Sequence, residues 1–539
     1  MLEWPEATIY QGLTSVAASA PSSLALIFED ETTTYGELVA ESRRLARALA
    51  ALDVGVGDTI AIWLRNRPAW IEAQLAASYL GASVVAVNTR CGSRDLDHVL
   101  NDAGVGVVLT EPGSSDPTHL EMLASLAPGI VDADLDAFSP DRYPDLSHVV
   151  TTTAAPGYDA VRSLQEMKDM ATAAPTPDPV DTPAASACVF YTSGTTGDSK
   201  GCPQSNRSLL NHSYQVGEHF DLSSDDVALG ALPFCGIMGH NTFLSALAHG
   251  IPLVLQPEFD AAAAIDLIET HEVTYFSAIG SMYERMVVTE EFTSERVTTL
   301  SKGAVAFVSG TDRETFERVE GAVGFPLVRP YGLSEANSQV FVGDPDATVE
   351  ERFRTGGPPV HPDEEAARVV DPETGDPLPT DEQGELCLRG YNVIDSYLGR
   401  PEATAAAVDE DGWFHTGDLA ERGPDGVYYH ARMDDALRVR GFLVAPRAVE
   451  RAVESHPAVD AAQVVGAPHP RHGQVPVAFV TGEDADETAV REFLVDRLAD
   501  YKVPERVFAV ASFPRTDGPH GRKIQKHELR DRVETLFEG

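Results

Sequence analysis

Lysine is scarce in this chain of 539 residues. Six lysines stand among 40 basic residues, against 84 acidic residues, and the formal net charge is −44. A surface of that charge repels phosphate backbones and anionic lipid headgroups. The composition therefore argues against nucleic acid or a membrane surface as a partner.

The acidic excess also predicts an environment rich in salt. Self-repulsion of this size destabilises a compact chain in dilute salt, whereas at about 1 M salt the Debye length is near 3 Å and the repulsion is screened. We expect a halophilic protein. An ordinary acidic protein is the alternative, and it would keep its activity and melting temperature without added salt.

Cysteine pairs and long apolar runs are missing as well. The five cysteines are odd in number and no two form a Cys-x-x-Cys pair, which argues against a disulfide framework and against a zinc motif. No apolar run approaches 18 residues, and the first residues lack the basic and apolar regions of a signal peptide. We expect reduced thiols and a soluble, cytoplasmic protein with no membrane span.

The length and the pattern of apolar residues predict an α/β protein in two unequal parts. At roughly 100–200 residues per domain, the chain holds two to four domains. Helical periodicity alternates with short apolar runs over 37–108, and a smaller α/β pattern follows residue 426. The smaller pattern is long enough for a separate, lid-like domain.

A loop of glycines and hydroxyl residues follows the apolar run 187–191. Residues 192–201 combine five hydroxyl side chains, three glycines and Lys200. Glycines allow close backbone approach, amides and hydroxyls donate to oxyanions, and Lys200 adds positive charge. The loop departs from the Walker pattern because a glycine follows Lys200. It predicts a phosphate site, with a flexible polar surface loop as the alternative; the predicted binding residues are Thr192, Ser193, Gly194, Thr195, Thr196 and Gly197.

Further motifs follow this loop in order. They are Tyr331-Gly332-Leu333-Ser334-Glu335, Gly412-Trp413-Phe414-His415-Thr416-Gly417-Asp418, Arg432-Met433-Asp434-Asp435 and Phe513-Pro514-Arg515-Thr516. With the phosphate loop, the series resembles the AMP-forming adenylating superfamily, which includes acyl-CoA synthetases, luciferases and peptide-synthetase adenylation domains. The resemblance covers nearly the whole chain and is closest to an acyl-CoA synthetase. It implies a large multi-subdomain N-terminal αβ region over 1–433 and a small mobile C-terminal α/β domain over 434–539.

The resemblance also implies how the nucleotide is held. Tyr331, next to Gly332, would stack on adenine, and Ser334 would contact the α-phosphate. Glu335 would hold Mg²⁺, a hard cation that prefers carboxylate oxygen. Asp418 would accept the ribose hydroxyls. Arg432 would bind ribose or phosphate oxygens, for which a guanidinium is suited.

The last part of the resemblance concerns the smaller domain. Asp434 matches the family's hinge residue, and Gly441 lies where the pantetheine thiol approaches the acyl carbon. The family's catalytic lysine is harder to place, because the position counted from Pro514 is occupied by His520. Alignment from Ile524-Gln525-Lys526 backwards predicts Lys523, after a three-residue insertion and with Arg522 in place of glycine. Lys526 and Arg522 are the alternatives to Lys523.

These residues imply a ligase that forms a carbon–sulfur bond. A carboxylate attacks the α-phosphate of ATP, pyrophosphate leaves, and the thiol of coenzyme A then displaces AMP from the acyl-adenylate. Lys200, Lys523, Ser334 and Glu335 with Mg²⁺ are the predicted catalytic groups. Two alternatives stay open: an enzyme that loads a carrier-protein thiol, and a degenerate nucleotide-binding module. A homodimer is also left open.

The acid-binding segment is the least regular of the motifs. Residues 232–239 match the family's P-x-F-H-x-x-G, and Gly236 stands where an aromatic or histidine gate is usual, with His240 as a replacement gate. No acidic residue lies between 232 and 249 to pair with a substrate ammonium, so an apolar fatty or aryl acid is favoured over an amino acid. The predicted wall of the acid pocket is Ile237, Met238, Ser309, Gly310 and Thr311. Core packing is an equal alternative for Ile237 and Met238. Ser309, Gly310 and Thr311 are also predicted to bind the cofactor.

Overall fold

The computed structural model describes most of the chain. The described residues are 3–113, 118–134, 138–192, 199–306, 313–362, 365–433, 435–439, 442–469, 473–482, 485–495, 497–518 and 521–537. Ten predicted site residues lie outside them: Ser193, Gly194, Thr195, Thr196, Gly197, Ser309, Gly310, Thr311, Asp434 and Gly441. Lys523 is described by its backbone only.

A seven-stranded sheet forms the first part of the large region. Its order is β7-β6-β5-β3-β4-β8-β9, parallel except for β9, which runs antiparallel to β8. The strands are β3 (Thr59–Trp63), β4 (Ser83–Ala86), β5 (Val107–Thr110), β6 (His148–Thr151), β7 (Val161–Ser163), β8 (Ser186–Tyr191) and β9 (Gly201–Ser205). The helices around it are α1 (Ile9–Ser19), α2 (Tyr35–Ala50), α3 (Pro68–Leu80), α4 (Ser93–Asp102), α5 (His119–Leu126) and α6 (Leu164–Met170).

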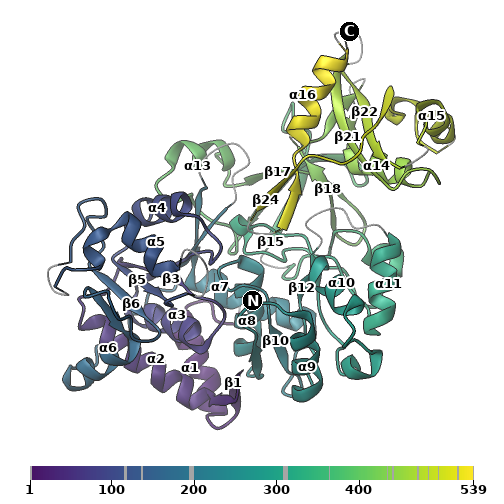
Figure 1. Cartoon of the computed structure of the whole chain (residues 1–539). Helices are drawn as coiled ribbons and strands as arrows, with labels where there is room; N and C mark the ends of the chain where they lie inside the picture. Colours follow the sequence, from purple (N-terminus) through teal and green to yellow (C-terminus); the bar gives the residue numbers. More distant parts are fainter. Residues whose placement is uncertain are drawn as a thin grey trace.

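Both faces of this sheet are buried, because successive strand side chains point to opposite sides. Ile60 and Ile62 pack with residues of α2 and α3 on one face. Ala61 and Trp63 pack with residues of α4 and α5 on the other. This layering, visible in Figure 1, explains why the strands read as nearly continuous apolar runs.

A second, four-stranded sheet of order β10-β11-β1-β2 lies beside the first. Its strands are β1 (Leu24–Phe28), β2 (Glu31–Thr34), β10 (Ala228–Gly230) and β11 (Leu253–Leu255), with the short pair β12 (Ala278–Ile279) and β13 (Val305–Ala306) nearby. The helices of this part are α7 (Asn206–His219), α8 (Ile237–Ala248), α9 (Ala261–His271), α10 (Gly280–Val288) and α11 (Arg313–Val323).

An antiparallel sheet of order β14-β18-β17-β16-β15 completes the large region. Its strands are β14 (Gly356–Gly357), β15 (Glu365–Val370), β16 (Gln383–Gly390), β17 (Phe414–Arg422) and β18 (Val427–Arg432), and the helices near it are α12 (Val349–Arg352) and α13 (Pro401–Ala407). The domain boundary predicted after residue 433 falls just beyond β18, and it stays a prediction.

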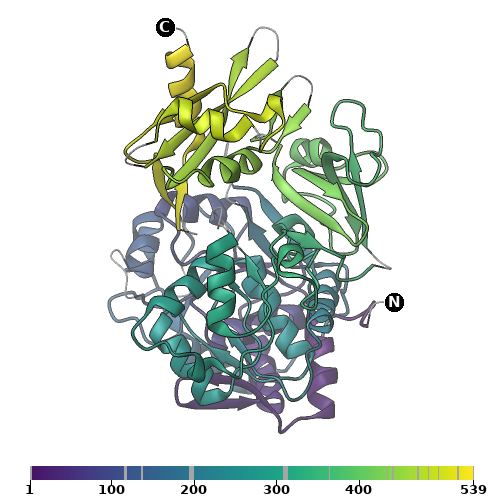
Figure 2. The same ribbon diagram turned by 90° about the vertical axis from the view of Figure 1, so that its right-hand side faces the viewer.

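The C-terminal part has its own cores on both sides of strands β21 and β22. Its strands are β19 (Leu437–Val439), β20 (Phe442–Val444), β21 (Ala461–His469), β22 (Gly473–Thr481) and β23 (Arg506–Ala509), and its helices are α14 (Pro446–Glu454), α15 (Glu487–Val495) and α16 (Lys526–Phe537). A hairpin of β24 (Arg515–Gly518) and β25 (Gly521–Ile524) extends from it toward the large region (Figures 1 and 2). In the described part of the chain, no helix is long and apolar enough to cross a membrane.

Candidate active site

The predicted phosphate loop connects β8 to β9 at the edge of the seven-stranded sheet. Its first and last parts are described, and Thr192 N donates a hydrogen bond to Lys200 O at 3.0 Å. Lys200 Nζ lies 4.8 Å from the centroid of the Tyr397 ring. The positive charge that ends the loop therefore faces the segment that carries Tyr397.

Tyr397 and Gln204 connect this loop to the motif around Glu335. The Tyr397 hydroxyl donates to Glu335 Oε1 at 2.8 Å. Gln204, on the strand that leaves the phosphate loop, donates from Nε2 to Ser334 O at 2.8 Å. The structure thus brings together a lysine and a carboxylate, the two groups that a polyphosphate and its divalent cation require. Neither Tyr397 nor Gln204 belongs to a motif, and the sequence gives no local signal for them.

The segment after Glu335 has an unusual backbone. Asn337, Ser338 and Gln339 have φ values of 60°, 62° and 35°, in the left-handed region. A Cβ on Gly332 would lie 2.2 Å from Gln339 N, so only glycine fits there. Asn337 Nδ2 donates to Ser208 O of helix α7 at 3.1 Å, which helps hold the segment. Strain of this kind costs about 1–3 kcal/mol per residue and is concentrated at functional sites.

Asp418 lies at the other end of the site, between a phenol and a guanidinium. Its Oδ2 accepts from the Tyr331 hydroxyl at 2.7 Å, and its Oδ1 accepts from Arg432 Nη1 at 2.9 Å. Burial raises the pKa of Asp418, and the nearby Arg432 and Tyr331 oppose that rise. The carboxylate is therefore fixed in orientation by groups on two different motifs.

The ring of Tyr331 is buried, and other aromatic rings lie against it. It is 5% exposed and makes nearly parallel ring contacts with Phe341 and Tyr429, at centroid distances of 5.9 and 5.6 Å. Its hydroxyl is engaged with Asp418. The stacking role predicted for Tyr331 stays a prediction, and what the described structure shows is a residue that orients Asp418.

The acid-binding segment turns into helix α8. Gly236 is the residue before the helix and carries no side chain to act as a gate. Ile237 and Met238 begin the helix and are half-buried; Met238 packs against two separate apolar clusters. Core packing, the alternative for these two residues, therefore accounts for at least part of their environment.

His240 is a buried residue of helix α8, and its role as a replacement gate stays a prediction. Its side chain is fully buried, with ring centroids 5.3 Å from Trp70, 5.1 Å from Phe190 and 4.5 Å from Phe243. Burial lowers the pKa of His240 to about 3, so the ring is neutral. One turn into α8, the side chain points to the packed face of the helix.

Asn66 holds the acid-binding segment in place. Its Nδ2 donates to Gly230 O at 3.0 Å and to Leu232 O at 2.8 Å, and its Oδ1 accepts from Phe234 N at 3.0 Å. Asn66 follows β3 closely, at the carboxyl end of a buried parallel strand. Polar residues at such strand ends are common in binding sites, and this signal could have identified Asn66 from the sequence.

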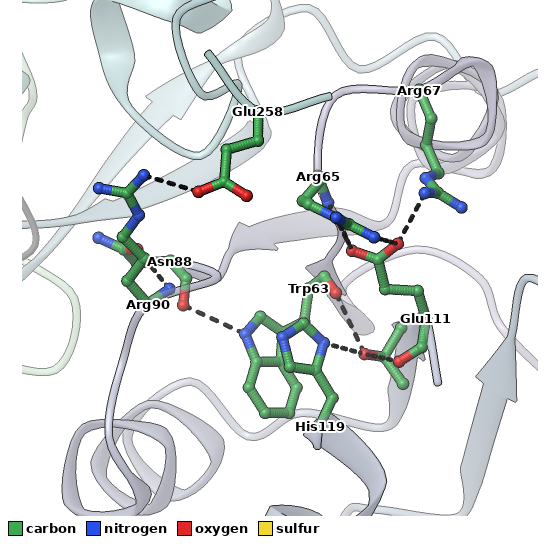
Figure 3. Close-up of polar contacts among 9 residues, drawn as sticks. Trp63, Arg65, Arg67, Asn88, Arg90, Glu111, His119 and Glu258 are labelled. Carbon is green, nitrogen blue, oxygen red and sulfur yellow. Dashed lines mark hydrogen bonds and ion pairs between the residues drawn. The ribbon is translucent and has the colours of Figure 1, made fainter. Parts of the chain in front are cut away.

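Charged side chains precede and follow Asn66 in the chain, and Figure 3 shows these and others of the same region: Arg65, Arg67, Arg90, Glu111 and Glu258. Arg65 Nε and Arg67 Nη2 both contact the Glu111 carboxylate at 2.7 Å, and Arg90 contacts Glu258 at 3.0 Å. Burial alone would raise the pKa of Glu111, but the hydrogen bond from Arg65 and the two guanidinium charges lower it. The edge therefore combines a fixed ion pair with an asparagine that shapes the acid-binding segment.

Comparison with known proteins gives a consistent result. The profile of AMP-binding enzymes matches residues 13–398, and that of the AMP-binding enzyme C-terminal domain matches 448–518. A feruloyl-CoA synthase from Amycolatopsis sp is 32% identical over 96% of this chain and 97% of its own length. ATP-bound MatB from Rhodopseudomonas palustris has a TM-score of 0.81 and 25% identity, covering 98% of this chain and all of that one. O-succinylbenzoate coenzyme A synthetase from Bacillus subtilis, in complex with ATP and a magnesium ion, has a TM-score of 0.75 and 26% identity, covering 97% of this chain and 99% of that one.

The extent of these matches agrees with the order of the motifs. The N-terminal profile spans the phosphate loop and the Glu335 motif, and the C-terminal profile covers most of the smaller part. The chain belongs to the AMP-binding enzymes, the adenylate-forming superfamily that its motifs resemble, and is most similar to their acid–CoA ligases.

Proposed function

We propose that this protein is an AMP-forming acid:CoA ligase that activates an aromatic or other apolar carboxylic acid. ATP with Mg²⁺ and coenzyme A are its co-substrates. The observation that carries the proposal is the convergence of Lys200, Glu335 and Asp418, linked through Tyr397, Gln204 and Tyr331. These residues come from distant parts of the chain and meet at one place.

The first half-reaction joins two anions, a carboxylate and a triphosphate. Lys200 and the amides of the phosphate loop offset the charge that develops on the phosphate oxygens. Glu335 would hold Mg²⁺, which would supply positive charge for the departure of pyrophosphate. Asp418 would bind the ribose hydroxyls and so orient the nucleotide. Donors of this kind each contribute about 3–4 kcal/mol to the transition state.

The backbone of the β24–β25 hairpin supports Lys523 as the lysine of this step. Thr516, the threonine of the predicted motif, pairs with Lys523 across the hairpin. The three-residue insertion predicted from the sequence falls between these two partners in the chain. Lys526 Nζ instead contacts Glu450 Oε1 at 2.8 Å, inside the smaller part.

Two lines of support favour an aromatic or apolar acid. The segment 232–249 carries no acidic side chain that could pair with an amino group. Feruloyl-CoA synthase and O-succinylbenzoate coenzyme A synthetase, two relatives that match nearly the whole chain, are named for aromatic acids. A fatty acid, as predicted from the sequence, is the alternative substrate class, and it would place the enzyme in fatty acid metabolism.

The substrate class is tested by ATP–pyrophosphate exchange with a panel of acids at molar salt. Hydroxycinnamates and benzoates should support the fastest exchange, and medium-chain fatty acids come next. Exchange with amino acids alone would contradict the proposed class. If none of the acids supports exchange, the alternative of a degenerate nucleotide-binding module would be favoured. A thioester formed on a carrier protein but never on coenzyme A would support the carrier-loading alternative.

The role of Lys523 is tested by separating the two half-reactions. Lys523→Ala should slow acyl-adenylate formation by about 10²–10³-fold, because one preorganised cation is lost. It should still convert supplied acyl-adenylate and coenzyme A to the thioester. Lys526→Ala is the matched control, and should leave both halves near wild type once its melting temperature has been checked. Equal loss of both halves in Lys523→Ala, or selective loss in Lys526→Ala, would contradict the assignment.

A cytoplasmic location and a homodimer stay predictions from the sequence. Sedimentation at molar salt measures the oligomeric state directly.

A further inference from the structure

Three side chains that commonly bind metals meet between strands β16 and β17. Glu385, Cys387 and His415 each offer one ligand atom, and these atoms lie within 4.8 Å of one another. Cys387 Sγ is 3.5 Å from His415 Nδ1, and Glu385 Oε2 is 2.9 Å from the same nitrogen. Cys387 is fully buried, while the Glu385 and His415 side chains keep 18% and 29% of their surface exposed.

The strand pairing explains why these residues meet. Glu385 and Cys387 are two positions apart on β16, so their side chains share one face of the sheet. Cys387 pairs directly with His415 on β17, whereas Glu385 pairs with Leu419, with a register shift between the two pairs. Gly417, inside the shift, has a φ of 66°. The sequence shows no such cluster, because its members lie on separate strands and not in a Cys-x-x-Cys motif.

The distances suit a tetrahedral ion. With Zn–S near 2.3 Å and Zn–N and Zn–O near 2.0–2.2 Å, the edges of the tetrahedron are roughly 3.5 Å for S–N and roughly 3.4 Å for N–O. The observed Sγ–Nδ1 distance of 3.5 Å equals the first. The observed Oε2–Nδ1 distance of 2.9 Å has to lengthen by roughly 0.5 Å, which requires a small rotation of the partly exposed Glu385 side chain.

The groups behind His415 also suit a bound metal. Its other nitrogen, Nε2, lies 3.6 Å from Asp409 Oδ2, and Arg368 Nη2 donates to that same oxygen at 2.7 Å. Histidines that ligate metals regularly face a carboxylate through their second nitrogen, which fixes the tautomer and the ring orientation. Nδ1 already lies at hydrogen-bond distance from Glu385 Oε2, so a cation that binds there displaces the proton between them, and the nearby Asp409 carboxylate then favours a proton on Nε2.

We propose that Glu385, Cys387 and His415 form a binding site for a transition metal ion of the Zn²⁺ class, with water as the fourth ligand. A thiolate and an imidazole select a borderline-soft cation over Mg²⁺, so this site is chemically distinct from the one at Glu335. Cysteine binds such a cation as the thiolate, so binding releases the Cys387 thiol proton to solvent.

The site adjoins the residue that we assign to the ribose. Glu385 Oε1 accepts from Gly417 N at 3.2 Å, and Thr416 Oγ1 donates to Leu386 O at 2.8 Å. Gly417 immediately precedes Asp418. An ion bound to Oε2 of Glu385 therefore restrains the strand that presents Asp418. This coupling to ATP rests on the proposed function, whereas binding of the ion does not.

Cobalt spectroscopy tests the site directly on the full chain. Titration with Co²⁺ should give one equivalent of a thiolate-to-cobalt absorption band with the visible bands of a tetrahedral ion, and Zn²⁺ should abolish them. Cys387→Val should remove the thiolate band, and His415→Ala should weaken binding at least tenfold. Cys91→Ser, which changes a half-buried cysteine outside the cluster, should keep the whole spectrum. Thermal melts of each variant show that the fold is retained.

The contrary results are equally clear. Absence of the band in the wild-type protein at saturating Co²⁺ would overturn the proposal, as would an unchanged band in Cys387→Val. The KM for ATP in pyrophosphate exchange, measured with chelator and with buffered Zn²⁺, tests the coupling separately. An unchanged KM would overturn the coupling alone. If the protein activates no acid, the proposed function is overturned, while the cobalt result still supports the metal site.

Discussion

Asp418 shows how the site controls the ionisation of a single side chain. Burial raises its pKa, and the cation of Arg432 with the phenol of Tyr331 keeps the rise in check. An acid whose pKa is raised in the folded state binds a proton at a pH where the unfolded chain has already lost it. Ionised Asp418 therefore costs folding free energy, and this cost grows as the pH rises through the raised pKa.

The pH dependence of ATP use follows from this ionisation. Binding of ribose hydroxyls requires the carboxylate, so kcat/KM for ATP should fall toward acid with a midpoint above the ordinary Asp value of about 3.9. Asp418→Asn should raise the KM for ATP at least tenfold and remove this acid limb from the pyrophosphate-exchange profile. Asp425→Asn, at an exposed position in the turn between β17 and β18, should leave the profile unchanged. An acid limb that persists in Asp418→Asn would show that another group titrates.

Few of the residues that hold the predicted site residues in place could be predicted from the sequence. The motifs named Lys200, Ser334, Glu335 and Asp418 because their chemistry is visible locally. Tyr397, which bonds to Glu335 across 62 positions of chain, has no local signature. The motif spacing predicts a gate at His240, whereas the burial of its side chain depends on how α8 packs and could not be predicted.

At the scale of elements, α8 and the segment before it depend on one side chain from another sheet. Asn66 satisfies two carbonyls and one amide of the residues that lead into α8. Those backbone groups are buried or nearly so, and each one left without a partner costs about 1–3 kcal/mol. The position of the predicted acid-binding segment therefore depends on this contact with Asn66.

Replacement of Asn66 tests that dependence. Asn66→Ala should lower the free energy of unfolding by about 2–4 kcal/mol and raise the KM for the acid more than the KM for ATP. Asn66→Asp keeps the acceptor for Phe234 N and loses both donors, so it separates the two contributions. Denaturant unfolding and pyrophosphate exchange with varied acid measure the two effects. Equal increases in the two KM values would contradict a specific role in the acid pocket.

The sequence predicted elements well where periodicity is local. The apolar run 59–64 predicts a strand, and the structure has β3 (Thr59–Trp63) there; the pattern of 447–453 predicts a helix, and the structure has α14 (Pro446–Glu454). The β16–β17 register could not be predicted, because it depends on a bulge around Gly417 and on side chains far apart in the chain. The cluster of Glu385, Cys387 and His415 was hidden for the same reason.

At the scale of the whole molecule, the charge of −44 is the dominant property. Many arginine and lysine side chains form ion pairs with nearby carboxylates. Arg296, for example, contacts both Asp266 and Glu269. The acidic residues outnumber these partners about two to one. Salt screens the remaining repulsion over distances beyond the Debye length.

Stability should therefore rise with salt. Between dilute buffer and about 1 M KCl, the Debye length falls to near 3 Å, and the melting temperature should rise by roughly 10 °C or more, together with activity. Calorimetry and pyrophosphate exchange across a KCl series measure this. Sucrose at equal osmolarity is the control, since it does not screen charge. A flat salt series would indicate an ordinary acidic protein.

The β24–β25 hairpin extends from the C-terminal part toward the large region, and Lys523 lies on its second strand (Figures 1 and 2). If the C-terminal part rotates about the segment after β18, as the resemblance predicts, Lys523 moves together with the whole hairpin, and its distance from the triphosphate depends on the angle of that rotation. A substitution on α15 or α16 that shifts this angle would then change the rate of adenylate formation without altering a catalytic group.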